Sequence, residues 1–357
     1  MLPRLWRYLA REQLRAVMAT LAVLLGLYLG IDLVGEVRDM RAGYGLLQVM
    51  MYVLATAPAR IYDLFPFALL IGSSLALARL ASGSELVAMR ACGFHRSRLL
   101  RALLSVALLL GVVVMQVGEW LAPGLELDAR IERERALDNQ LGRGSGQSLW
   151  VRDGQRIIHV AWLSWAQGLD ERIRFDDLTL YQLDGNGDIE GWIRADSAEH
   201  WPGQWQLSQA RVRTIGTGDR AEVQSLMVLE SSLDPGLFRA LATRPRLMSL
   251  RDIARIRSWL ASNGQATVEF DQAFWRRLLY PFNLLAMVFA GMAMMLALSR
   301  SVPPGLGVFS GVALGVGFLL VQRLVLGLAP IVPGPLFVLH LLPLVVFLLI
   351  GWLLLRR

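Results

Sequence analysis

Six long apolar stretches run through this sequence, and they limit what the chain can fold into. An α-helix needs about 20 consecutive apolar residues to cross the hydrocarbon core of a bilayer. That length is reached, with few charges, at 16–34, 53–80, 99–122, 273–298, 305–328 and 335–355. The whole chain departs from soluble proteins in the same direction, since 55% of its residues are hydrophobic and only 18% are charged. We therefore predict an α-helical membrane protein with six transmembrane helices.

The basic residues are unevenly distributed, which predicts an orientation in the membrane. The first 15 residues and the 81–98 loop are rich in arginine, whereas the 35–52 loop contains only Arg38 and Arg41. By the positive-inside rule, both termini and the 81–98 loop face the cytoplasm, and residues 1–15 lie along the membrane surface. Residues 124–271 then form one external domain. Because the net charge of +7 comes from these membrane flanks, we expect no nucleic-acid partner.

The residue types that are scarce in this chain exclude several kinds of chemistry. All 36 basic residues are arginine, so the chain has no phosphate-loop lysine and no Schiff-base lysine. A single cysteine, Cys92, permits no intrachain disulfide. The four histidines are scattered along the sequence and do not predict a metal site. We expect no cofactor, no metal ion and no catalytic residues.

The external block at 124–271 has the pattern of an antiparallel sheet flanked by helices. A charged helix is expected at 124–141, as a continuation of the third span. Seven short, partly alternating segments follow, with turn signals between them. They lie at 149–152, 156–160, 178–183, 192–194, 205–207, 210–213 and 222–228. This pattern predicts an all-β sandwich or jelly roll. A last external helix is predicted at 250–262, with Ser249 as its cap and Asn263-Gly264 as its end.

A stretch at 84–94 separates the second and third apolar runs and is too polar to extend either. Ser84 is placed to cap a short helix, Glu85 puts negative charge at its positive end, and Gly93 is placed to end it. A mixed apolar and charged surface, suited to a groove on another protein, is predicted for Leu86, Val87, Met89 and Arg90. From the residues alone, a plain connecting loop is an equal alternative.

Charged residues also occur in or beside the apolar stretches, where they are costly unless paired or hydrated. The set comprises Asp32, Glu36, Arg38, Arg41, Asp63, Glu119 and Arg323. The arginines among them are expected near the external ends of their helices. There a guanidinium could bind the phosphate of an anionic lipid through two hydrogen bonds. The alternative is that these residues are interfacial anchors or internal pairs, such as Glu119 with Arg323.

The sequence resembles the LptF/LptG family of lipopolysaccharide export permeases. The resemblance covers nearly the whole chain and rests on three spans, a sheet domain and three more spans, with the 84–94 segment after the second. It leans toward the LptG branch. That leaning rests on Gly118-Glu119-Trp120-Leu121-Ala122-Pro123, Leu149-Trp150-Val151-Arg152-Asp153-Gly154 and Arg300-Ser301-Val302-Pro303.

This resemblance implies a bacterial inner-membrane heterodimer of two permeases, an LptB ATPase dimer that drives it, and LptC. Lipopolysaccharide would enter from the outer leaflet between the two bundles, through gates formed by the first and fifth spans, and pass to a periplasmic jelly-roll bridge. The segment at about 82–95 would be the coupling helix, with Glu85 engaging an ATPase arginine. Arg38 and Arg41 would approach the lipid phosphates.

Three other functions are compatible with the residues. A permease of another lipid or lipoprotein exporter would have four spans, with its external domain after the first. A membrane-embedded hydrolase would need a nucleophile and a base, for which Ser73 or Ser74 with His340 is the only pairing available. A passive scaffold would transport normally without Glu85.

The orientation predicts where Cys92 can be labelled. In intact cells, a thiol reagent that cannot cross the inner membrane should leave Cys92 unmodified, whereas a membrane-permeant reagent should label it. Mass spectrometry of the labelled protein measures the modified fraction. Labelling by the impermeant reagent would overturn the orientation.

Overall fold

A computed structural model represents the protein, and it describes residues 2–41, 43–137, 149–165, 173–185, 187–201, 204–215, 222–230, 245–297, 304–328 and 335–356. The chain forms two compact units. The first contains residues 1–40, 46–129 and 271–357, and the second contains residues 41–45 and 130–270. The segment at 300–303 and residue 357 lie outside the described residues, as do 138–141 of the helix expected after the third span.

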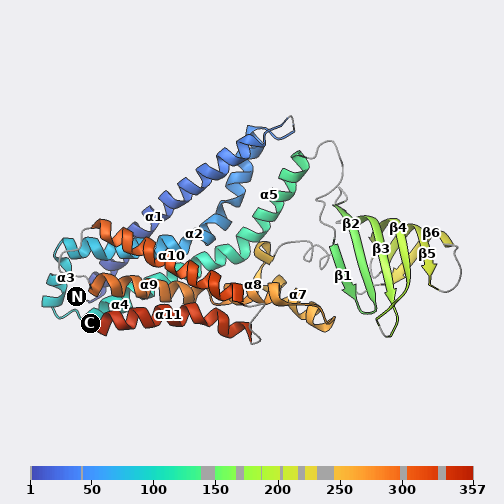
Figure 1. The fold of residues 1–357 in the computed structure, drawn as a ribbon. Coiled ribbons are helices and arrows are strands. Elements are labelled where there is room, and N and C mark those ends of the chain that lie inside the picture. Colours follow the sequence, from blue (N-terminus) through green and yellow to red (C-terminus); the bar gives the residue numbers. More distant parts are fainter. Residues whose placement is uncertain are drawn as a thin grey trace. The chain divides into compact units, whose positions relative to one another are not determined.

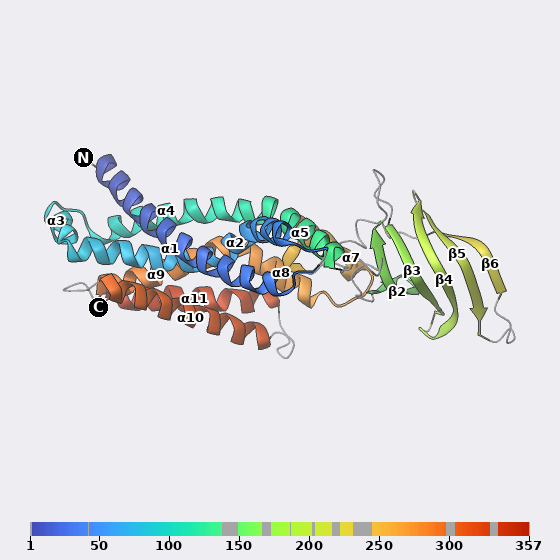
Figure 2. The ribbon, with the colours of Figure 1, turned by 90° about the horizontal axis from the view of Figure 1, so that it is seen from above.

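The first unit is a bundle of long helices, and among the described residues six of them are long and apolar enough to cross a membrane. The predicted six-helix class is confirmed. Figures 1 and 2 show the two termini and the short helix α3 (Glu85–Ala91) at the same end of this bundle. Its long helices are α1 (Leu2–Arg38), α2 (Leu46–Ser82), α4 (Arg96–Gln116), α9 (Tyr280–Ala297), α10 (Pro304–Leu328) and α11 (Leu336–Arg356).

The helix boundaries differ from the sequence expectation at two places. The expected surface segment at 1–15 is instead the first part of the continuous helix α1. The expected fourth span at 273–298 is divided at Leu279 between α8 (Val268–Leu278) and α9. The third span continues from α4 through η1 (Val117–Leu121), a turn of π-helix, into α5 (Ala122–Leu137).

Helix α2 lies at the centre of the bundle, because α1, α9 and α10 all pack extensively against it. Gly72 makes the α1 contact possible: a Cβ there would lie 2.6 Å from Cα of Val17. Gly311 allows α10 to pack closely on α2, since a Cβ at Gly311 would lie 3.0 Å from Cα of Ile71. Small residues thus bring backbones together, as is typical of helix packing in membranes.

The second unit contains a six-stranded antiparallel sheet, which confirms the predicted β domain. Each strand pairs with its sequence neighbour, in the order β1-β2-β3-β4-β5-β6 (Figure 1). The segments expected at 205–207 and 210–213 are both parts of β5. The strands are β1 (Leu149–Asp153), β2 (Arg156–Trp165), β3 (Ile173–Leu183), β4 (Ile189–Trp201), β5 (Gln204–Thr214) and β6 (Glu222–Glu230).

The described strands do not have the predicted sandwich or jelly-roll topology. A jelly roll needs connections that cross between two sheets, whereas these strands form a single meander. In the observed topology each strand is hydrogen-bonded directly to the strand that precedes it in the sequence. Between β1 and β2 the turn contains Gly154 in a left-handed conformation.

The sheet bends along one line that crosses three strands. Buried residues lie three positions apart there, in place of two: Phe175 and Leu178 in β3, Ala195 and Ala198 in β4, and Leu207 and Ala210 in β5. Asp177 and Gln209 adopt positive φ angles of 54° and 55° on this line. An irregularity of this kind changes the face to which the following side chains point, so the same face stays apolar on both sides of the bend.

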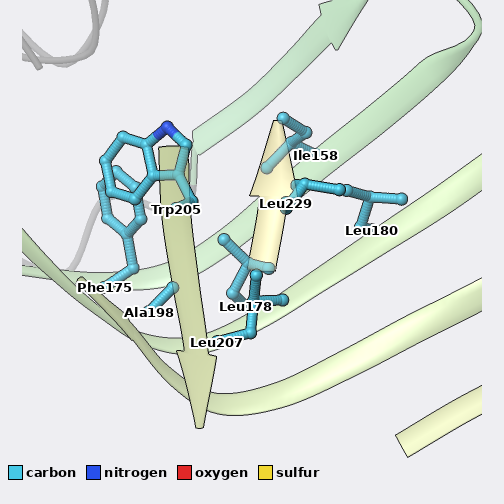
Figure 3. A pocket seen from close by; sticks show the side chains of 8 residues that line it. All are labelled: Ile158, Phe175, Leu178, Leu180, Ala198, Trp205, Leu207 and Leu229. Carbon is cyan, nitrogen blue, oxygen red and sulfur yellow. The ribbon is translucent and has the colours of Figure 1, made fainter. Parts of the chain in front are cut away.

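A small apolar hollow lies on this face (Figure 3). It is lined by Ile158, Phe175, Leu178, Leu180, Ala198, Trp205, Leu207 and Leu229. On the polar side, Arg194 donates two hydrogen bonds to the carboxylate of Asp177, at 2.8 and 3.0 Å. This guanidinium lowers the pKa of Asp177 and holds it in its left-handed conformation.

Helix α7 (Leu250–Ser262) confirms the helix predicted after the sheet. Ser249 caps it as expected, since its Oγ accepts a hydrogen bond from the backbone N–H of Asp252. The helix ends at Asn263, and Gly264 follows with a φ of 65°. Its buried residues, Ile253, Ile256 and Leu260, follow the helical spacing of the sequence.

Candidate functional site

The short helix α3 (Glu85–Ala91) occupies the segment predicted between the second and third spans. Its predicted N-terminal cap is wrong. Ser84 has a left-handed conformation (φ 56°) and its hydroxyl makes no capping hydrogen bond. An N-cap residue normally has extended backbone angles, from which its oxygen reaches the first turn. Ser84 instead reverses the chain after α2, which removes that geometry.

The carboxyl end of α3 is built as predicted. Gly93 has a φ of 78°, which glycine adopts without steric cost. Its backbone N–H bonds to the carbonyl of Arg90, and the N–H of Phe94 bonds to the carbonyl of Met89. This pair of hydrogen bonds is the Schellman motif, which commonly ends helices at glycine. Met89 and Phe94 both pack against the main hydrophobic cluster of the bundle.

One predicted docking residue of α3 points inward. Leu86 is only 5% exposed and belongs to the main hydrophobic cluster of the bundle, so it anchors α3 and presents no surface of its own. The interpretation of Leu86 as part of a docking face is corrected accordingly. Helical geometry turns the neighbouring side chains away from the bundle. Val87 is 65% exposed, and Cys92 is also exposed.

The two charged residues of α3 have different surroundings. Glu85 accepts a 2.7 Å hydrogen bond through Oε2 from the hydroxyl of Tyr8, in the first turns of α1. Arg90 is partly buried, and its Nη2 has no hydrogen-bond partner among the described residues. Burial lowers the pKa of Arg90, and Arg96 lowers it further. The helix therefore carries a carboxylate that is already oriented and a guanidinium that is poorly solvated.

The three predicted lipid-binding arginines are exposed. Arg38 ends α1, and Arg323 lies near the carboxyl end of α10. Arg41 lies in the second unit, where its backbone forms a bridge with Tyr44. Within the described parts of the chain, none of the three guanidinium groups forms an ion pair.

Two ion pairs inside the bundle involve arginines that the sequence analysis missed. Arg60 is 8% exposed, lies 3.2 Å from Asp32 on α1, and its guanidinium packs over the ring of Tyr28. Arg277, on α8, binds Glu119 at 3.0 Å. The pairing expected between Glu119 and Arg323 is therefore wrong, because Arg277 is the cation that α8 brings beside η1. Both missed arginines lie within predicted apolar spans, which was the available signal.

The Glu119 pair belongs to a compact polar cluster. Arg277 also donates to the backbone carbonyl of Gly118, at 3.3 Å. The rings of Tyr62 and Tyr280 stack with centroids 4.3 Å apart, and the Tyr280 hydroxyl donates to the carbonyl of Tyr62. A Cβ at Gly118 would overlap the ring of Tyr62, so only glycine fits there. Single turns of π-helix, like the one here, often mark functional sites.

The residues proposed for a hydrolase are not arranged for catalysis. Ser73 accepts a hydrogen bond from Gln13, and His340 bonds through Nδ1 to the carbonyl of Leu336 on its own helix. No hydrogen bond between His340 and Ser73 or Ser74 occurs in the described residues. A search of the same residues finds no group of metal-binding side chains.

The buried pair should respond to mutation as a unit. Glu119→Leu removes the carboxylate that lies 3.0 Å from the guanidinium of Arg277, which is 7% exposed, and should destabilise the protein by about 3–5 kcal/mol. The double variant Glu119→Leu/Arg277→Leu should be more stable than this single variant, because no buried charge is left. Unfolding of the purified protein in detergent measures the difference.

An exposed pair provides the matched control. Arg211→Gln removes the partner of Asp196, at a site where both side chains are more than half exposed, and should change stability little. If the double Glu119/Arg277 variant loses as much unfolding free energy as the two single variants lose together, the two buried residues are not coupled.

Comparisons with known proteins agree with this architecture. The family model described as lipopolysaccharide export system permease LptF/LptG matches residues 7–357. The chain is 30% identical to the LptG permease protein of Haemophilus influenzae, over all of this chain and 99% of that protein. It is 28% identical to LptG of Escherichia coli over 98% of both chains, and 24% identical to LptF of Escherichia coli over 62% of this chain. The chain therefore belongs to the LptF/LptG family of lipopolysaccharide export system permeases.

Proposed function

We propose that this chain is the LptG-type subunit of an ATP-driven exporter in the bacterial inner membrane. The exporter would extract lipopolysaccharide from the outer leaflet and pass it to a periplasmic bridge toward the outer membrane. An LptF-like sister permease, an LptB ATPase dimer and LptC would complete it. The observation that carries this proposal is the full-length match to LptG relatives, on a bundle with a sheet domain after its third span.

The energy for transport must come from outside this chain. Nucleotide-hydrolysing proteins of the phosphate-loop class need a glycine-rich loop and its lysine, and this chain contains no lysine. We infer that α3 receives the force of a partner ATPase. Supporting features are its position at the arginine-rich end of the bundle, its exposed Val87 and the oriented carboxylate of Glu85. Ser84, Met89 and Arg90 would flank this contact, and Leu86 would hold the helix in place.

The arginine-rich end of the bundle would face the cytoplasm, in accord with the positive-inside rule. The sheet domain would then lie in the periplasm. Arg38, Arg41 and Arg323 would meet the phosphates of lipid A, because an exposed guanidinium without an internal acid is available for bidentate binding.

The apolar face of the sheet suits the acyl chains of the transported lipid. All eight side chains around its hollow are apolar, so a methylene group placed there would gain about 0.8 kcal/mol relative to water. The sugars could remain hydrated outside. We propose that this face forms part of the path along which the lipid leaves the membrane.

The first test of this function concerns Glu85. In proteoliposomes containing the complete exporter, Glu85→Ala should reduce lipopolysaccharide release per ATP hydrolysed by about tenfold or more, because a charge-assisted contact is lost. Normal release by the Glu85 variant would favour a passive scaffold.

The second test concerns the exposed arginines. Arg38→Asp and Arg41→Asp should weaken photo-crosslinking between lipopolysaccharide and the adjoining end of α1, because they replace attraction for phosphate by repulsion. Arg7→Asp makes the same change at the opposite end of α1 and should leave crosslinking intact. Equal crosslinking in all three variants would leave Arg38 and Arg41 as interfacial anchors.

A further inference from the structure

We propose that Tyr8 positions the carboxylate of Glu85 and links α3 mechanically to α1. This inference deepens the proposed function, on which it rests, by adding a second residue to the coupling site. Tyr8 is 77 residues away from Glu85 in the sequence, and only the tertiary structure brings them together. Tyr8 is a positioning residue, since it would act on the ATPase contact through Glu85.

The geometry leaves Glu85 able to bind a second partner. The hydroxyl of Tyr8 occupies Oε2 at 2.7 Å, a short distance typical of a donor to an ionised acceptor. Oε1 has no hydrogen-bond donor among the described residues. A carboxylate can accept about four hydrogen bonds. A cationic side chain of a partner could therefore bind Oε1 while Tyr8 stays on Oε2.

Helix α3 needs an external contact of this kind at its beginning. It has seven residues, and a helix this short has little stability by itself. The hydroxyl of Ser84 does not cap it, although the buried Leu86 anchors its first turn and Gly93 ends it. A free glutamate side chain also samples many rotamers, and ordering it costs conformational entropy. The hydrogen bond from Tyr8 orders Glu85 before any partner binds.

The same contact connects α3 to the helix with the least buried span. Next to Tyr8, α1 is held on α2 by an ion pair between Glu12 and Arg79 at 3.9 Å. A buried hydrogen bond from Gln13 to Ser73 follows at 2.9 Å. The apolar window of α1 is only 11% buried, and within the bundle α1 packs mainly against α2. A displacement of Glu85 would therefore be transmitted to α1 through Tyr8.

The test uses Tyr8→Phe in the complete exporter, reconstituted with its ATPase and sister permease in proteoliposomes loaded with lipopolysaccharide. This variant keeps the ring and removes the hydroxyl. Lipid release per ATP hydrolysed should fall about three- to tenfold, the range expected for losing one ordinary, solvent-exposed hydrogen bond. Subunit assembly and the unfolding temperature should stay unchanged. Release per ATP equal to that of the unmodified exporter would overturn the inference.

A second background distinguishes positioning from a general structural effect. Glu85→Gln keeps an oxygen for Tyr8 but removes the charge, so adding Tyr8→Phe to it should cause little further loss. An equal further loss in this background would show that Tyr8 does not act through Glu85. Trp6→Phe changes a 43% exposed ring on the same helix, and a loss matching that of Tyr8→Phe would also overturn the inference.

The unmodified exporter separates this inference from the proposed function. If it hydrolyses ATP without releasing lipopolysaccharide, the proposed function fails. If it releases lipid and Tyr8→Phe releases equally well, only the role of Tyr8 fails.

Discussion

A charge inside an apolar helix bundle is stable only when another helix supplies its counter-charge, because no water is present to replace it. Asp32 and Arg60 meet this requirement between α1 and α2, and Glu119 and Arg277 meet it between η1 and α8. The second pair joins the helix before the inserted sheet domain to the helix after it. Residues more than 150 positions apart are thereby brought together at the base of the insertion. The two halves of the bundle close around that contact, and stacked tyrosines with Gly118 fill the space beside it.

The opposite end of the bundle uses weaker and more exposed contacts. There α3 is held by Leu86 in the core and by the hydrogen bond between Tyr8 and Glu85. Exposed hydrogen bonds break and re-form at low cost, whereas a buried ion pair does not. This difference would suit a molecule in which α3 moves while the contact between η1 and α8 keeps its geometry.

In the sheet domain, local changes of the backbone keep the apolar side chains on one face. The meander of six strands has one broad apolar face, whose residues, such as Phe175, Leu180 and Leu207, are buried. The bend marked by Asp177 and Gln209 curves this sheet without turning its apolar residues outward. The ion pair of Asp177 with Arg194 supports the unusual backbone at the bend. The result is a hollow whose lining is apolar, as a lipid acyl chain requires.

The sequence by itself determined the six helices, the antiparallel strands, the caps of α7 and the glycine end of α3. Each of these follows from local periodicity or from the conformational freedom of single residues. Tertiary structure alone decided which charges pair, so Arg277 and not Arg323 meets Glu119. It also decided that Ser84 does not cap α3, that Leu86 points inward and that the strands form one bent meander. These features depend on contacts between segments far apart in the chain, and local patterns carry no information about which distant residues will meet.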